Sequence, residues 1–299
     1  MRRVAPGLVA LVVLSVLPLY AGALPTVGLS ISTLNNPFFV DLRDGGQAAA
    51  KRLNVNLVVL DAQNDSAREA SQIEDLIQRK VAVIAINPTD SDAIVPTIRK
   101  INAARIPVIT VDRGANGGDV LAHIASDNVA GGMMAADYVG KRLNGKGNVV
   151  MLEGIAGTSA ARDRGKGFRE GLKKYPGITL VAVQTADFDR AKGLAVMENI
   201  LQAQKKVDAV FAQNDEMALG AVQAVDAAKR QKEMFVVGFD AIADAVAAVK
   251  AGKMAATIAQ QPTVMGRLAV EAAVKVINKQ SVPKFTPVPL RLVTKETAK

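Results

Sequence analysis

The stretch VAVIAINPTDSDAIVPTIRKINAARIPVITVDR, residues 81–113, has the pattern of a strand, a helix and a second strand. Its two outer parts, VAVIAI and PVITV, are almost continuously apolar and rich in β-branched residues. Such runs are typical of strands that are buried on both faces of a parallel sheet. Residues 90–104 lie between them and have a helical pattern, so the stretch predicts one strand–helix–strand unit of a parallel sheet.

The same alternation continues along the chain and predicts an α/β protein with doubly wound parallel sheets. Further helices are predicted at residues 66–80 and 190–203. About half of the predicted strands precede residue 125, and two sheets of ordinary size are easier to build than one very large sheet, so two domains joined by short hinges are expected. The nine predicted strands span residues 27–32, 56–61, 81–87, 107–112, 149–153, 180–184, 209–213, 235–240 and 255–260.

The first 23 residues have the features of a cleaved secretory signal peptide. Arg2 and Arg3 precede an uncharged apolar run at residues 7–19, and Ala21-Gly22-Ala23 supplies small residues for cleavage before Leu24. A buried first helix or a retained membrane anchor is the alternative, but the run is short for a membrane span. The chain has no cysteine, which excludes a lipid anchor, a disulfide and a thiolate site. We therefore expect an exported protein that is free in a bacterial periplasm.

The basic charge of the chain favours a solvated surface over a nucleic-acid or membrane partner. The chain has 37 Lys+Arg against 28 Asp+Glu, a formal charge of +9, and loss of Arg2 and Arg3 would leave 35 against 28, or +7. The cations are interleaved with acids on the predicted helices, and no run of five like charges occurs. No nucleic-acid partner is expected.

Polar and aromatic side chains gather at the ends of the predicted strands, where open α/β sheets bind their ligands. Aspartate accepts hydrogen bonds from hydroxyl groups, arginine donates them, and asparagine and glutamine do both. Phenylalanine could stack on the apolar face of a sugar ring, since the chain has no tryptophan. This combination indicates a cleft for a ligand rich in hydroxyl groups. The residues at the strand ends include Asn36, Phe38, Phe39, Asn87, Asp112, Arg113, Arg164, Phe188, Asn214, Asp240 and Gln260.

Several of these side chains also have a purely structural interpretation. Asp90, Asp189 and Asp215 are better explained as helix N-caps. Asp112 and Arg113 could form a local ion pair, Phe38 and Phe39 could belong to the core, and Asp240 could be a turn residue. His123, the single histidine, lies in an apolar context and is expected to be structural.

Motifs for catalysis are missing from the sequence. It has no G-x-G-x-x-G after the first strand, no Walker sequence, no H-E-x-x-H and no G-x-S-x-G. Asp112 and Asp240 could serve acid–base chemistry, but a polar cleft in an exported protein fits binding better. We expect no enzymatic activity, no catalytic residue, no metal site and no cofactor.

A family resemblance is carried by motifs that run in order from about residue 26 to near the C-terminus. They are STLNNPFF (32–39), INPTDSDA (86–93), IPVITVDR (106–113), HIASDN (123–128), GIAGTSAARDRGKGF (154–168), ADFDRAKGL (186–194), VFAQNDEMALGA (210–221), VVGFD (236–240) and AATIAQ (255–260). These motifs resemble the ribose-binding members of the type I periplasmic binding protein family. That family has two Rossmann-like domains, three hinge crossovers and a sugar between the domains.

The resemblance implies sugar contacts from both domains, with Arg162 as a neighbour that does not touch the ligand. It also implies a monomer that closes on D-ribose, or on a similar monosaccharide such as allose or another pentose, and is read by an ABC-type permease. A chemoreceptor is a further candidate partner. The implied N-terminal lobe spans residues 24–126 plus 260–287, and the C-terminal lobe 127–259 plus 288–299. The implied contacts are Asn36, Phe38, Phe39, Asp112, Arg113, Arg164, Phe188, Asn214, Asp240 and Gln260, with Asn87 ranked lower.

Overall fold

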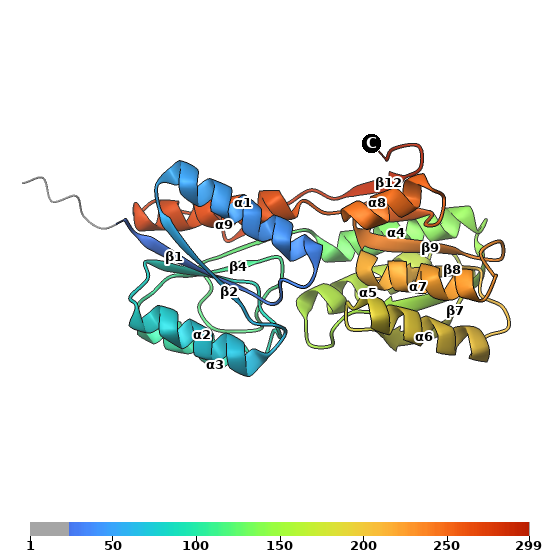
Figure 1. Cartoon of the computed structure of the whole chain (residues 1–299), viewed down its shortest axis with the longest axis horizontal. Coiled ribbons are helices and arrows are strands. Elements are labelled where there is room, and N and C mark those ends of the chain that lie inside the picture. Colours follow the sequence, from blue (N-terminus) through green and yellow to red (C-terminus); the bar gives the residue numbers. More distant parts are fainter. Residues whose placement is uncertain (1–23, 299) are drawn as a thin grey trace, which may run out of the picture.

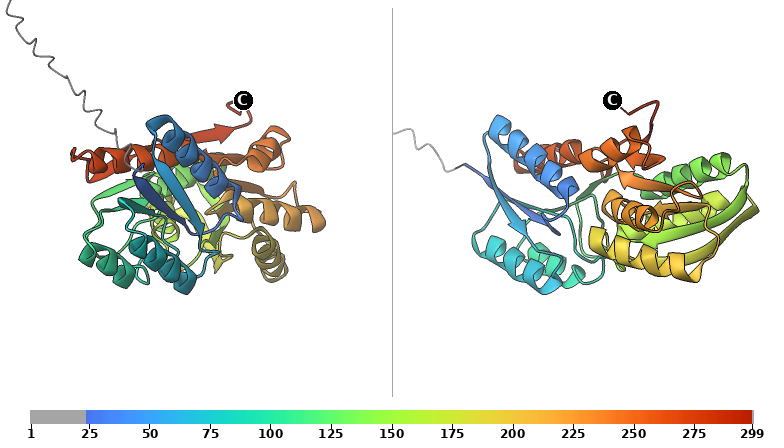
Figure 2. Two further views of the ribbon diagram at one scale, coloured as in Figure 1. Left: turned by 60° about the vertical axis from the view of Figure 1, so that its left-hand side comes forward. Right: turned by 45° about the vertical axis from the view of Figure 1, so that its right-hand side comes forward.

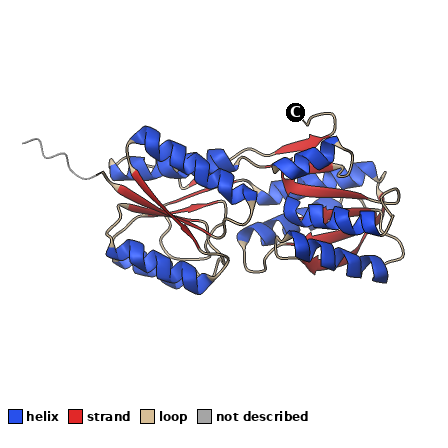
Figure 3. Cartoon of the chain, viewed as in Figure 1, coloured by secondary structure: helices blue, strands red, loops and turns tan. Residues whose placement is uncertain are grey.

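A computed structural model of the chain describes residues 24–298. The predicted signal peptide, residues 1–23, lies outside the described residues. Two lobes, each built on its own six-stranded sheet, lie end to end (Figure 1). Layers of helices cover the sheets on both faces (Figure 3). The predicted doubly wound α/β fold is confirmed.

The N-terminal lobe contains a fully parallel sheet with the strand order β11-β5-β4-β3-β1-β2. Its helices α1 and α9 cover one face of the sheet, and α2 and α3 cover the other (Figure 1). The strands are β1 (Thr26–Ile31), β2 (Asn56–Asp61), β3 (Val83–Ile86), β4 (Val108–Val111), β5 (Ala122–Ala125) and β11 (Phe285–Pro287). The helices are α1 (Pro37–Leu53), α2 (Ser66–Gln78), α3 (Val95–Ala103) and α9 (Pro262–Ile277).

The C-terminal lobe has the strand order β12-β10-β9-β8-β6-β7, in which only β12 is antiparallel to its neighbour. Helices α4 and α5 pack on one face, and α6, α7 and α8 pack on the other. The strands are β6 (Lys146–Glu153), β7 (Gly177–Thr185), β8 (Ala209–Ala212), β9 (Phe235–Asp240), β10 (Ala256–Ala259) and β12 (Arg291–Thr294). The helices are α4 (Asn128–Arg142), α5 (Ser159–Leu172), α6 (Arg190–Ala203), α7 (Asp215–Ala227) and α8 (Ala243–Lys250).

Strand β3, the first strand of the predicted strand–helix–strand unit, is apolar because helices cover both faces of the sheet at this position. Val83 and Ala85 of β3 pack in the cluster beneath α1 and α9, whereas Ile84 and Ile86 pack beneath α2 and α3. Side chains on a strand alternate between the two faces of a sheet. A strand between two helix layers therefore has no position left for a polar side chain.

The chain passes between the two sheets three times, and Figure 2 shows the two lobes from two further sides. It leaves the first sheet after β5 and returns from β10 into α9, which packs on α1. It then leaves β11 of the first sheet and enters β12 of the second. Three adjacent crossings favour rotation of one lobe against the other about a hinge, since only short segments must bend.

Helix α3 begins later than predicted, at Val95 instead of residue 90. Asp90 Oδ1 accepts hydrogen bonds from the amides of Asp92 and Ala93, so it caps a turn that precedes the helix. The first helical positions include Pro96, which has no amide proton to donate and suits a helix start. Among the described residues, no helix has both the length and the apolarity needed to cross a membrane.

Candidate functional site: a polar cavity between the lobes

A small cavity lies between the lobes, where the carboxyl ends of both sheets face each other. Asp112 follows β4, Asp240 ends β9, and Gln260 follows β10. The lobes also contact each other directly beside it: the Gly114 amide donates to Ser159 Oγ at 2.9 Å, and the Ser91 amide donates to the Gly157 carbonyl at 3.0 Å. The cavity is lined by Asn36, Phe38, Phe39, Asp112, Arg113, Ala160, Arg164, Phe188, Asn214, Asp240 and Gln260.

Of the eleven side chains predicted as ligand contacts, all except Asn87 line this cavity. Asn87 is fully buried behind Asp112. Its Nδ2 donates to Asp112 Oδ2 at 3.0 Å, and its Oδ1 accepts from the amide and hydroxyl of Ser32. In the structure Asn87 therefore orients Asp112 and does not itself line the cavity.

The aromatic part of the N-terminal lobe depends on the start of α1. Asn36 has an extended backbone, and its Oδ1 accepts from the Phe38 amide at 3.0 Å as the N-cap of the helix. This cap leaves Asn36 Nδ2 available to donate to a ligand. Phe38 and Phe39 follow in the first turn with their rings perpendicular, 5.1 Å between centroids. Both are buried, so they form an apolar wall of the cavity.

Arg113 lies between aromatic rings of the two lobes. Its guanidinium carbon is 5.2 Å from the centroid of Phe39 and 5.4 Å from that of Phe188. Its Nη1 donates to the Pro88 carbonyl at 3.4 Å, a long hydrogen bond. The alternative of a local ion pair between Arg113 and Asp112 is not realised, since these two described residues form no ion pair within 4.0 Å. Asp112 adopts a left-handed backbone, φ 62°, which turns the chain sharply at this point.

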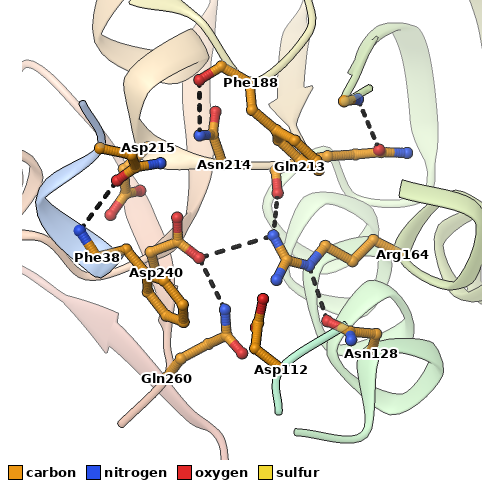
Figure 4. Close-up of polar contacts among 12 residues, drawn as sticks. Phe38, Asp112, Asn128, Arg164, Phe188, Gln213, Asn214, Asp215, Asp240 and Gln260 are labelled. Carbon is orange, nitrogen blue, oxygen red and sulfur yellow. Dashed lines mark hydrogen bonds and ion pairs between the residues drawn. The ribbon is translucent and has the colours of Figure 1, made fainter. Parts of the chain in front are cut away.

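Arg164 is held firmly by its own lobe (Figure 4). Its Nε donates to Asn128 Oδ1 at 2.8 Å, and its Nη1 donates to the Gln213 carbonyl at 2.7 Å. The same Nη1 lies 3.6 Å from Asp240 Oδ1, and both side chains are almost fully buried. The guanidinium also stacks on Phe239 at 3.9 Å from the ring centroid. Asn128 and Gln213 were not predicted, because nothing in the sequence links them to Arg164.

Asp240 receives a second contact from the segment that returns to the first lobe. Gln260 Nε2 donates to Asp240 Oδ1 at 2.8 Å. Burial raises the pKa of Asp240 to about 7, although the nearby charge of Arg164 acts to lower it. Burial likewise raises the pKa of Asp112. Both carboxyl groups are therefore held where the charged form is costly unless a partner supplies hydrogen bonds.

Phe188 is positioned by Asn214 and by a close approach of the backbone. Asn214 caps α7 through Oδ1, which accepts from the Met217 amide at 2.9 Å, and its Nδ2 donates to the Phe188 carbonyl at 3.1 Å. Phe188 adopts a left-handed backbone, φ 58°. A Cβ at Gly154 would lie 2.0 Å from the Phe188 ring, so only glycine fits there. The ring is half-buried and faces the mouth of the cavity.

The N-cap predictions had mixed outcomes. Asp189 caps α6, with Oδ1 accepting from the Lys192 amide at 2.8 Å, as predicted. The prediction for Asp215 is wrong: Asn214 is the cap, and Asp215 lies inside the helix, buried. The prediction for Asp90 is wrong for α3, as described above. His123 is half-buried, pairs with Thr110 and stacks on Phe285, as its predicted structural role requires.

The cavity suits an uncharged ligand. It contains two carboxylates, Asp112 and Asp240, and two guanidinium groups, Arg113 and Arg164, so its formal charges cancel. Three buried polar atoms at its wall have no hydrogen-bond partner among the described residues: Asp112 Oδ1, Arg113 Nε and Gln260 Oε1. In the described part of the chain no group of three His, Cys, Asp or Glu residues could hold a metal ion.

Comparison with known proteins places this architecture in a family. The periplasmic binding protein domain matches residues 27–281. The chain is 52% identical over 274 residues to the ribose import binding protein RbsB of Haemophilus influenzae, covering 92% of this chain and 93% of that protein. It is 34% identical to the D-allose-binding periplasmic protein of Escherichia coli, covering 88% and 90%. A Bacillus halodurans solute-binding protein, solved with bound myo-inositol, superposes with a TM-score of 0.88 at 34% identity, covering 92% and 96%.

Proposed function

The chain belongs to the periplasmic binding protein family, and from this we propose that it binds D-ribose between its lobes and delivers the sugar to an ABC-type importer. One observation carries the proposal: a buried, charge-balanced cavity whose wall presents two carboxylates, two guanidinium groups and the phenylalanine rings. A hydroxyl group both donates and accepts, so one small sugar can satisfy carboxylates and guanidinium groups together. The C–H faces of its ring can pack on Phe38, Phe39 and Phe188.

The unpartnered polar atoms explain why a sugar of the right shape would bind tightly. A buried polar group without a partner costs about 1–3 kcal/mol. Asp112 Oδ1 and Gln260 Oε1 accept hydrogen bonds and Arg113 Nε donates one, so together they fit a ligand with several hydroxyl groups. A sugar that lacks one of these hydroxyl groups would leave its partner unsatisfied. We therefore propose that the ten cavity-lining residues predicted from the sequence contact the sugar, while Asn87 acts through Asp112.

Closure of the lobes follows from the positions of Arg113 and Phe188. Arg113 belongs to the first lobe and is flanked by Phe39 of the same lobe and Phe188 of the other. This arrangement exists only when the lobes are together, so opening would hydrate both edges and let the sugar enter. We propose hinges at the three crossings, with lobe boundaries at residues 24–126 plus 260–287 and 127–259 plus 288–299.

The proposed setting is the periplasm, after export and removal of residues 1–23. There the closed, sugar-loaded monomer would be recognised by the permease, and a chemoreceptor is a second candidate partner. The ligand is bound and released unchanged. Incubation of ribose with the protein should therefore return ribose alone, whereas a product would identify a sugar-modifying enzyme.

A related monosaccharide is the main alternative, because one relative at 34% identity is named for D-allose. A thermal-shift screen across ribose, 2-deoxyribose, allose, arabinose and xylose separates these candidates, followed by calorimetry on the best ligand. We expect the largest stabilisation with ribose and a weaker effect with 2-deoxyribose, which lacks one hydroxyl group. A larger shift with another sugar would overturn the choice of ribose.

Solution scattering tests closure separately from specificity. We expect the radius of gyration to fall when ribose saturates the protein. An unchanged radius would contradict a hinge that closes on the ligand. In either case calorimetry measures the affinity for ribose, whether or not the lobes close.

A further inference from the structure

Asp215 is a buried carboxylate that does not line the cavity but lies directly behind it. It occupies the first position of α7, next to Asn214, and its side chain is shielded from solvent. Its Oδ2 accepts from the Ile242 amide at 2.9 Å, and its Oδ1 accepts from Thr257 Oγ1 at 2.7 Å. Thr257 Oγ1 in turn accepts from the Ala241 amide at 3.2 Å. Asp215 thus fixes two successive amides, one of them through Thr257.

These contacts hold a turn that the backbone does not favour. Asp240 has φ 123° and Ala241 has φ 59°, so two successive residues other than glycine lie in the left-handed region. Such conformations persist only where surrounding contacts determine them. The turn follows β9, and it is the segment from which the Asp240 side chain reaches the cavity. Figure 4 shows Asp215 beside Asp240, on the side away from Arg164.

The surroundings of Asp215 are shaped for a carboxylate. Gly238 of β9 leaves the space for it, because a Cβ there would lie 2.1 Å from Asp215 Oδ1. The position at the N-terminus of α7 favours a negative charge. Both of its side-chain hydrogen bonds are accepted ones, as an ionised carboxylate requires.

We propose that Asp215 is a positioning residue for sugar binding, which holds the turn at residues 240–242 so that Asp240 faces Arg164 and the ligand. The inference rests on the proposed function, since it assumes that Asp240 contacts the sugar. It also accounts for a polar network, Asp215–Thr257–Ala241, that the cavity itself does not use. The nearest Asp240–Arg164 approach, 3.6 Å, is the geometry that the turn sets.

Asp215 also influences the ionisation of Asp240 through the turn that it holds. Burial and the like charge of Asp240 raise the pKa of Asp215 itself. The charged or polar groups that act on the pKa of Asp240 are Arg164, Gln260, Asp112 and Arg113, and the charge of Arg164 is the largest that lowers it. When Asp215→Asn releases the turn, Asp240 should lose its place opposite Arg164 and its pKa should rise, so the carboxylate form that binds hydroxyl groups would require a higher pH.

The test compares Asp215→Asn and Thr257→Val with a matched control, Asp226→Asn. Asp226 is an exposed aspartate at the opposite end of α7. Ribose affinity is measured by calorimetry between pH 5.5 and 8.5. At pH 7.5 we expect Asp215→Asn to weaken binding about tenfold to a hundredfold, the range for a lost hydrogen bond to a charged group. The pH midpoint of its affinity should move upward, while Thr257→Val weakens binding less and Asp226→Asn matches the wild type.

Hydrogen exchange of the ligand-free proteins supplies a measurement that needs no sugar. Asp215→Asn and Thr257→Val should both speed exchange of the Ala241 and Ile242 amides. If the wild type failed to bind ribose, the proposed function would fall, and this exchange would still test the turn. Protected amides together with a ribose affinity within about twofold of wild type would overturn the role of Asp215. A lowered melting temperature with an unchanged pH midpoint and affinity would do so as well, because it would assign Asp215 to stability alone.

Discussion

The two lobes supply the same pair of charges to the cavity but hold them differently. In the N-terminal lobe Asp112 and Arg113 are adjacent in sequence, do not pair with each other, and each keeps a buried atom without a protein partner. In the C-terminal lobe Arg164 and Asp240 come from α5 and β9 and lie 3.6 Å apart. Arg164 is fixed by two short hydrogen bonds, whereas Arg113 has one long one.

This difference indicates that the two halves of the site have different roles in binding and closure. Arg164 of the C-terminal half is held by its own lobe, so we propose that this half engages the sugar before closure. The N-terminal half completes its contacts through the ligand and through Phe188 of the other lobe. Substitutions in the C-terminal lobe should therefore act on binding itself, and those in the N-terminal lobe should act partly through closure.

The largest effect is expected for Arg164→Ala. It leaves Asp240 buried without its cation, and breaking a buried ion pair costs about 3–5 kcal/mol, which corresponds to more than a hundredfold in dissociation constant. Calorimetry with ribose measures the loss. Arg162→Ala is the matched control, because Arg162 is on the same helix with an exposed side chain that pairs with Asp163. Near-wild-type binding by Arg164→Ala would contradict the proposal that substitutions in the C-terminal lobe act directly on binding.

Arg113→Met should cost less than Arg164→Ala. Methionine keeps an unbranched apolar side chain between the rings of Phe39 and Phe188 and loses the guanidinium, so we expect about 1.5–3 kcal/mol from lost charged hydrogen bonds. Calorimetry gives the affinity, and scattering at saturating ribose shows whether the lobes still close. Losses equal to those of Arg164→Ala, with full closure, would contradict the division between the lobes.

The carboxylates at the site should lower the stability of the ligand-free protein. Because the pKa of Asp240 is about 7 in the folded state and 3.8 is the ordinary value, the folded state binds more protons than the unfolded state between these values. The free energy of unfolding should therefore fall as pH rises from about 4 to 7. Asp240→Asn should weaken this dependence and raise the melting temperature at pH 8 by about 2–4 °C for each kcal/mol gained.

Asp137→Asn is the control for that measurement, because the pKa of Asp137 is shifted in the opposite direction. Hydrogen bonds from Lys141 and Tyr175 lower the pKa of Asp137, so its removal should not raise the melting temperature at pH 8. Calorimetric or fluorescence melts of both variants from pH 4 to 8 make the comparison. An Asp240→Asn protein less stable than wild type at pH 8 would show that the Arg164 pair outweighs the burial of the charge.

The smallest effect on ribose binding is expected for a substitution of Glu69, which supports the loop behind Arg113. Glu69 of α2 is fully buried, and its carboxylate accepts from the Thr89 amide and from Thr89 Oγ1 at 2.7 Å. It thereby fixes the loop whose Pro88 carbonyl receives Arg113. Glu69→Gln should weaken ribose binding about threefold, in the lower range for coupling between neighbours. Glu74→Gln on the same helix, an exposed residue that pairs with Lys100, should have no effect, and equal losses in both would exclude a link to Arg113.

Most of the fold could be predicted because buried parallel strands carry a strong local signal. All nine predicted strands exist, and α6 has the predicted bounds. Strands β5, β11 and β12 were not predicted. Each of them has four residues or fewer. Strand β11 contains Pro287 and strand β12 contains Arg291, and both strands lie at sheet edges. The pairing partner of β11 is β5, which is far away in sequence, so no local pattern reveals β11.

The site could be predicted as far as residues follow strand ends. Ten predicted side chains meet at one cavity, but the groups that orient them do not show in the sequence. Glu69 looks like an ordinary charged residue of an amphipathic helix, and Asp215 looks like a helix cap. Their burial arises only when helix, loop and neighbouring strand pack together. Ala160 of α5 also lines the cavity, and a small residue gives no signal of such a role.

The three crossings between the sheets have a consequence for how the chain acquires its structure. Strand β5 pairs with β11, so His123 is a register partner of Phe285, and β10 pairs with β12. These contacts span a large separation in sequence, which slows folding because a long loop must close first. Both final edge strands lie within residues 285–294. During synthesis neither sheet can be completed until this segment has been made, and a chain shortened before Phe285 would lack an edge strand in both.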